Sequence, residues 1–117
     1  MIVFDASTLI LIAKIELLDL FLAGIELEVA VPGEAEAIAL ALKEKAQLVG
    51  IDDKNGINAC KLLGLGFTTA LAILVRSREK GSINRNDALA KLAALARNGR
   101  YKNSIVDDAR LKLEAQK

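Results

Sequence analysis

The chain has 117 residues, of which 53% are hydrophobic and 26% charged, with a formal net charge of +1. These values predict one domain over residues 1–117. The longest apolar run near the N-terminus is broken by Lys14 and Glu16, which excludes a membrane span, and the chain lacks the basic start and small-residue cleavage site of a signal peptide. A single cysteine, Cys60, excludes an internal disulfide and favours a cytoplasmic location. The absence of histidine excludes Ser-His-Asp catalysis and histidine-bearing zinc sites.

Apolar runs and helical spacings predict strands that alternate with helices along the whole chain. The expected strands cover Ile2–Phe4, Leu27–Val31, Gln47–Ile51 and Phe67–Thr69. The expected helices run from Ser7 or Thr8 to Phe21, over residues 35–42, over Lys54–Leu63 before Gly64, up to Lys80 before Gly81, from Asn86 to Arg97, and from Ser104 onward. This alternation predicts an α/β fold with a mostly parallel sheet of about four strands, covered by helices.

Five carboxylates are expected near one edge of this sheet. Asp5 closes the first strand, and Asp52 and Asp53 follow the third. Glu34 and Glu36 open the helix that leads into the third strand. Functional groups collect at the carboxyl ends of parallel strands, so we expect these side chains to meet there. Clustered carboxylates repel one another, and without histidine or thiol ligands the expected neutralising ion is Mg²⁺ or Mn²⁺.

Each of these carboxylates also has a structural explanation. Glutamates at a helix start, such as Glu34 and Glu36, interact favourably with the helix dipole, and Asp52 or Asp53 can cap the next helix. Asp5 has the fewest structural reasons to be present, because it ends a wholly apolar strand.

The orientation of the two glutamates depends on the apolar stripe of their helix. The expected stripe consists of Ala35, Ile38, Ala39 and Leu42. Glu34 and Glu36 then flank this stripe on opposite sides, so only one of them is expected to face a given ion.

Charge is divided unevenly along the chain. The segment from Met1 to Ala59 has four basic and ten acidic residues, whereas the remainder has twelve basic and five. The division suggests a metal site beside a phosphate-attracting surface, although from charge alone ordinary solvated helices are the simpler explanation. The candidate phosphate contacts are Arg76, Arg78, Lys80 and Arg85. Because only four residues are aromatic, we expect any RNA contact to be mainly electrostatic.

Three motifs resemble those of the PIN domain family. The run Ile2–Ile10 resembles the opening of PIN domains, in which the first strand ends in an aspartate followed by serine or threonine. Gly33–Ala41 and Ile51–Asp53 resemble the sequence G-E-x-E-A-I-x-L-A followed by I-D-D of an archaeal and bacterial branch. The resemblance extends to about Ile83 and implies a three-layer α/β/α fold.

The resemblance also implies a site and a cofactor. The principal metal ligands and catalytic residues would be Asp5, Glu34 and Asp52, with Mg²⁺ or Mn²⁺ bound. Glu36 and Asp53 would be supplementary carboxylates.

The resemblance further implies a metal-dependent endoribonuclease, either the toxin of a toxin–antitoxin pair or an RNA-processing nuclease. Ser7 would orient the site through its hydroxyl or a bound water, unless it is a plain helix cap. The implied partners are an RNA substrate and an antitoxin protein, and the apolar helices leave room for a homodimer.

The chain departs from the family pattern in two places. Relatives place further helices, with another acidic ligand, where Pro32 here runs directly into Gly33, so the domain is a minimal variant or lacks a segment. Relatives also carry an arginine after I-D-D and a glycine before the threonine near Thr69, and this chain does not. The alternative function is a catalytically degenerate PIN-like module that acts through protein or RNA binding. A phosphoacceptor domain is a third reading, which lacks the expected lysine and hydroxyl at later strand ends.

Overall fold

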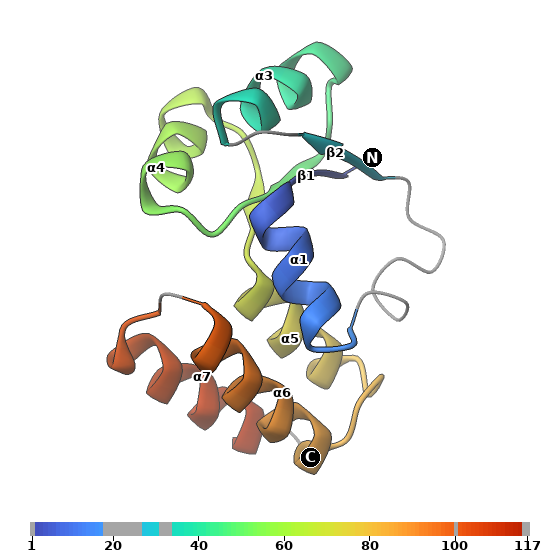
Figure 1. The fold of residues 1–117 in the computed structure, drawn as a ribbon, viewed down its shortest axis with the longest axis vertical. Coiled ribbons are helices and arrows are strands. Elements are labelled where there is room, and N and C mark those ends of the chain that lie inside the picture. The colour runs from blue at the N-terminus through green and yellow to red at the C-terminus, as the bar shows by residue number, and fades with distance from the viewer. Residues whose placement is uncertain (1, 18–26, 31–33, 100, 116–117) are drawn as a thin grey trace.

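The computed structural model describes residues 2–17, 27–30, 34–99 and 101–115 of the chain, and it has helices on both faces of a parallel sheet (Figure 1). The elements in chain order are β1 (Ile2–Asp5), α1 (Ala6–Lys14), β2 (Leu27–Ala30), α3 (Glu34–Glu44), β3 (Leu48–Gly50), α4 (Lys54–Leu63), β4 (Phe67–Thr68), α5 (Ala70–Glu79), α6 (Arg85–Asn98) and α7 (Asn103–Ala115). No helix in these ranges is long and apolar enough to cross a lipid bilayer.

The sheet has four strands in the order β2-β1-β3-β4, and all neighbouring pairs are parallel. Phe4 of β1 lies opposite Gly50 of β3, where a Cβ atom would overlap the Phe4 ring. The predicted mostly parallel sheet of about four strands is therefore confirmed. Because the strands are parallel, their carboxyl ends share one edge, and β1 and β3 are neighbours there.

Alternating residues of β1 face two separate apolar layers. Ile2 and Phe4 pack into one cluster with buried side chains of α1, α5, α6 and α7. Val3 packs into the other cluster with residues of β3, α3 and α4. Figure 1 shows the same arrangement, with α3 and α4 on one side of the strands and the other helices across from them. The three-layer α/β/α architecture implied by the resemblance is confirmed.

Two of the predicted helix ends are correct, and each lies at a glycine. Gly64 caps α4 and Gly81 follows α5, and both have positive φ angles of 70° and 77°. Glycine adopts this left-handed conformation without the steric cost that a Cβ imposes, so the sequence signal for these ends is strong.

Both predicted ends of the first helix are wrong. Asp5, rather than Ser7 or Thr8, is the N-cap of α1, because its carboxylate accepts a hydrogen bond from the Ser7 N–H. The helix ends at Lys14 instead of continuing to Phe21, which lies outside the described residues. The Lys91 ammonium group of α6 donates to the Ile15 carbonyl at 2.6 Å and satisfies the helix end from a distant part of the chain.

Two further helix starts differ from the prediction. Asn84, rather than Asn86, caps α6, because its side chain accepts a hydrogen bond of 2.8 Å from the Asp87 N–H. The preceding residue, Ile83, is buried in the core. The last helix begins at Asn103, one residue before Ser104.

The predicted apolar stripe of α3 is correct at Ile38 but wrong at Ala39 and Leu42, and the side chain of Ala35 lies outside the described part of the structure. The buried side chains are Ala37, Ile38 and Ala41, whereas Ala39 is exposed and Leu42 is 50% exposed. The three buried residues pack in the same cluster as Val3, Val49 and Ile51 of the sheet side.

Candidate active site

A cleft of about 970 Å³ lies at the carboxyl edge of the sheet, between α1, the start of α4 and the link from α6 to α7. Among the described residues, the acidic ones that line it are Asp5, Asp52 and Asp53. The wall also includes Ser7 and Tyr101, together with apolar side chains from α1 and α4. A smaller hollow of about 420 Å³ lies between α5 and α7, but no strand-end carboxylate lines it. The larger cleft is therefore the candidate site.

Asp5 ends β1 at the floor of the cleft and is only 4% exposed. Its carboxylate accepts a hydrogen bond of 3.4 Å from the Ser7 N–H and so caps α1. The structure thus gives Asp5 a structural role that the sequence did not reveal. The role does not conflict with ligand binding, because a carboxylate has about four lone-pair sites.

Asp52 follows β3 and is held by two donors from later parts of the chain. The Ala70 N–H, at the start of α5, lies 3.2 Å from Asp52 Oδ1. The Tyr101 hydroxyl donates to the same oxygen at 2.7 Å. The α5 N-terminus is the positive end of a helix dipole and favours a negative group there. The Asp52 carboxylate is consequently fixed at the edge of the cleft rather than free to rotate.

Tyr101 is a site residue that the sequence analysis did not identify. Burial, the charge of Asp52 and the hydrogen bond to Asp52 raise the pKa of the Tyr101 hydroxyl well above its ordinary value. The hydroxyl therefore stays protonated and acts as a permanent donor. No local sequence signal marks Tyr101, and the close packing of its ring against Gly99 is visible only in the structure.

The other predicted carboxylates have different surroundings. Asp53 is exposed and caps α4 by accepting from the Gly56 N–H at 3.1 Å, although it still lines the cleft. Glu36 is exposed in the first turn of α3 and does not line the cleft. Glu34 is the first residue of α3, and its side chain lies outside the described part of the structure.

The donor chemistry of the cleft suits a hard divalent cation. Its acidic groups are all carboxylates, which Mg²⁺ and Mn²⁺ prefer. Cys60 packs in the cluster between the sheet and α3–α4, where burial raises the pKa of its thiol. Within the described ranges, no group of three or more acidic, histidine or cysteine side chains forms a metal site. A full ligand set would thus need a further group besides Asp5 and Asp52.

Four lysines, which the sequence analysis did not single out, also line the cleft. They are Lys14, Lys54, Lys61 and Lys102, from α1, α4 and the link before α7. A signal for two of them was present in the sequence, because Lys54 and Lys61 are seven residues apart and share one face of a helix. The lysines place positive charge around the carboxylates.

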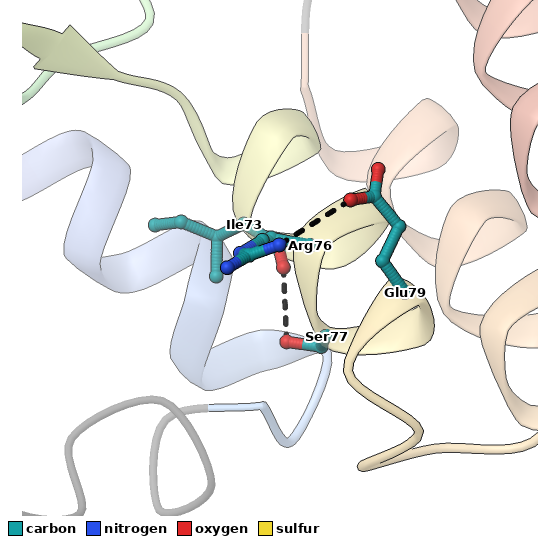
Figure 2. A network of polar contacts seen from close by, with 4 residues as sticks. All are labelled: Ile73, Arg76, Ser77 and Glu79. Carbon is teal, nitrogen blue, oxygen red and sulfur yellow. Dashed lines mark hydrogen bonds and ion pairs between the residues drawn. The ribbon is translucent and has the colours of Figure 1, made fainter.

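The cations predicted to contact phosphate lie elsewhere. Arg76, Arg78 and Lys80 are at the end of α5 that is remote from Asp52, and Arg85 opens α6. Figure 2 shows Arg76 in an ion pair with Glu79 at 3.5 Å, beside a hydrogen bond of 2.9 Å from the Ser77 hydroxyl to the Ile73 carbonyl. None of these four cations is among the described residues that line the cleft, so the structure does not bring them to the carboxylates.

Comparisons with known proteins extend the sequence resemblance. A family model described as a PIN domain matches residues 25–115. The matched range includes the positions of Glu34, Asp52 and Tyr101 and reaches the end of α7, beyond the motifs seen in the sequence. No curated protein and no solved structure matches the chain.

Proposed function

The chain belongs to the PIN domain family, whose members are generally nucleases, and from this premise we propose that it is a Mg²⁺- or Mn²⁺-dependent endoribonuclease. The observation that carries the proposal is the cleft itself. Asp5 and Asp52, from the ends of neighbouring strands, line it together with four lysines. Carboxylates that bind a cation beside lysines that attract phosphate match the needs of phosphodiester hydrolysis.

The proposed principal ligands are Asp5, Asp52 and Glu34. Position 34 is one helical turn before Ile38, which is buried between α3 and the sheet. This spacing supports Glu34 as the third ligand. Asp53 and Glu36 are proposed as supplementary carboxylates, with weaker support, because Asp53 caps α4 and Glu36 is exposed.

Different residues of the chain are proposed to position the metal ligands, orient the site and attract the RNA. When bound, a divalent cation supplies charge neutralisation and water activation for attack on a phosphodiester. The Ala70 N–H and the Tyr101 hydroxyl hold Asp52 in place before substrate arrives. Ser7 lines the cleft and is proposed to orient the site through its hydroxyl or a water. The lysines that line the cleft attract the phosphate backbone of the RNA; they are Lys14, Lys54, Lys61 and Lys102.

The biological setting of this activity is proposed from the resemblance. The chain would act either as the toxin of a toxin–antitoxin pair, with an antitoxin partner, or as an RNA-processing nuclease. A homodimer is also proposed, and it would draw on the exposed apolar side chains of Leu62, Leu63 and Leu111.

The direct test is cleavage of labelled single-stranded RNA by the purified chain with Mg²⁺ or Mn²⁺, and with the metal removed by EDTA. We expect metal-dependent cleavage whose rate falls more than about 100-fold in Asp5→Asn and Asp52→Asn. This loss exceeds the one that usually follows removal of a residue that only hydrogen-bonds to a metal ligand. Asp87→Asn, which changes an exposed charge in the first turn of α6, is the matched control and should retain activity. Full activity in Asp5→Asn would overturn the proposal.

The second candidate is a catalytically degenerate module that binds RNA or protein. It is favoured by one observation, namely that the described residues alone contain no three-ligand metal group. Retained RNA binding without cleavage at any metal concentration would select this function over the first.

A further inference from the structure

The two donors that contact Asp52 lie closer to one of its carboxylate oxygens than to the other. Tyr101 donates to Oδ1 at 2.7 Å, and the Ala70 N–H lies 3.2 Å from the same atom. Oδ2 receives only the longer contact of 3.4 Å from that N–H. A carboxylate held in this way keeps Oδ2 as the oxygen more available to a further partner in the cleft.

The segment that carries Tyr101 is anchored on both sides. Before it, the Gly99 N–H donates to the Leu95 carbonyl at 2.7 Å at the end of α6. After it, the Lys102 carbonyl accepts from the backbone N–H groups of Ile105 and Val106 at 3.0 and 3.1 Å. Gly99 leaves the space that the Tyr101 ring occupies. Backbone hydrogen bonds thus hold the described residues Gly99 and Lys102 on either side of Tyr101.

We propose that Tyr101 is a positioning residue for the metal site, because its hydroxyl orients the Asp52 carboxylate toward the cleft. The inference rests on the proposed function, which makes Asp52 a metal ligand. Tyr101 acts through Asp52 and needs no contact with the metal or the RNA. A hydrogen bond from a second residue commonly fixes the orientation of a metal-binding carboxylate and strengthens its binding.

The test is the affinity of the intact chain for Mn²⁺, measured without RNA by electron paramagnetic resonance of the free ion. Tyr101→Phe keeps the ring and removes the hydroxyl. We expect its Mn²⁺ dissociation constant to rise about 10-fold or more, with an altered spectrum of the bound ion. Ser77→Ala is the matched control, since it removes a buried hydroxyl hydrogen bond on α5 outside the cleft, and its affinity should equal that of wild type.

A second pair of variants tests whether the effect passes through Asp52. Once Asp52→Ala has removed the carboxylate, adding Tyr101→Phe should weaken Mn²⁺ binding no further. If Tyr101→Phe does not fold, Gly99→Ala carries the same test, because its Cβ displaces the ring. It should weaken Mn²⁺ binding in the same direction.

The outcomes separate this inference from the proposed function. Wild-type chain that binds no Mn²⁺ would overturn both. Wild-type binding that is lost in Asp52→Asn but unchanged in folded Tyr101→Phe would overturn the positioning role alone. A further loss on adding Tyr101→Phe to Asp52→Ala would also overturn it, because Tyr101 would then act on another group.

Discussion

Individual residues of the candidate site were predictable where the signal is local. The shared position of Asp5 and Asp52 in the cleft was predictable because each lies at or just after the carboxyl end of an apolar strand, and parallel strands bring these ends together. Tyr101 was missed because its contact with Asp52 spans 49 residues of sequence. Nothing near Tyr101 in the chain indicates a carboxylate, so only the packing of α7 and its preceding link reveals the pair.

Gly50 provides a residue-scale prediction about the sheet. A Cβ at this position would overlap the Phe4 ring across the β1–β3 pair, so Gly50→Ala should lower the free energy of unfolding by about 1–3 kcal/mol, the usual cost of overpacking a core. Urea denaturation followed by circular dichroism measures the change. In the Phe4→Leu background the smaller side chain should relieve part of the overlap, and simple additivity of the two changes would contradict this explanation.

Single elements were predicted well where their own residues determine them. Gly64 and Gly81 mark helix ends through their backbone conformation, and both ends were correct. The predictions for the end of α1 and for Ala39 and Leu42 of α3 were wrong because contacts with other elements determine these features. Lys91 satisfies the α1 terminus from 76 residues away, and the packing of α3 on the sheet decides which of its residues are buried.

The basic residues of α4 and α5 lead to an element-scale prediction. RNA affinity should depend on Lys54 and Lys61, which line the cleft, more than on Arg76 and Lys80, which do not. In the cleavage-deficient Asp52→Asn background, Lys54→Gln with Lys61→Gln should weaken binding of single-stranded RNA and reduce the salt dependence of the binding constant by about 0.7 per lost phosphate contact. Fluorescence anisotropy at several salt concentrations measures both quantities.

Two cations at the C-terminal end of α5 serve as the matched control in that experiment. Arg76→Gln with Lys80→Gln removes the same charge from the remote end of α5, and it should leave affinity and salt dependence unchanged. The reverse pattern would support the phosphate contacts that the sequence alone suggested.

At the scale of the whole molecule, the fold class was predictable and the distribution of charge was not. Alternating strands and helices with short links admit few arrangements, so a mostly parallel sheet covered by helices followed from the pattern. The acidic and basic halves of the sequence, however, do not remain separate in space. Lys14 and Lys54 come from the acidic half, and Lys61 and Lys102 from the basic half, yet all four line one cleft with the aspartates.

The aspartates in the cleft predict that metal binding raises the stability of the whole domain. The buried Asp5 carboxylate and the Asp52 carboxylate share the cleft, so a bound cation should offset their repulsion and stabilise the folded state. With Mn²⁺ at about 100 times its dissociation constant, linkage predicts about 2.7 kcal/mol of added stability. For a domain of this size, that gain corresponds to a Tm increase on the order of 10 °C by scanning calorimetry.

Asp52→Asn is the informative variant for that measurement. Removing the charge relieves repulsion from Asp5 but weakens the hydrogen bonds that Asp52 accepts from Ala70 and Tyr101, so the Tm of the metal-free variant is the baseline for its Mn²⁺ effect. The same substitution should abolish most of the Mn²⁺-dependent increase, since a principal ligand is lost. Asp107→Asn, which only breaks an exposed ion pair with Arg110 on α7, should keep the full increase. An equal Mn²⁺ effect in both variants would show that the ion binds outside the cleft.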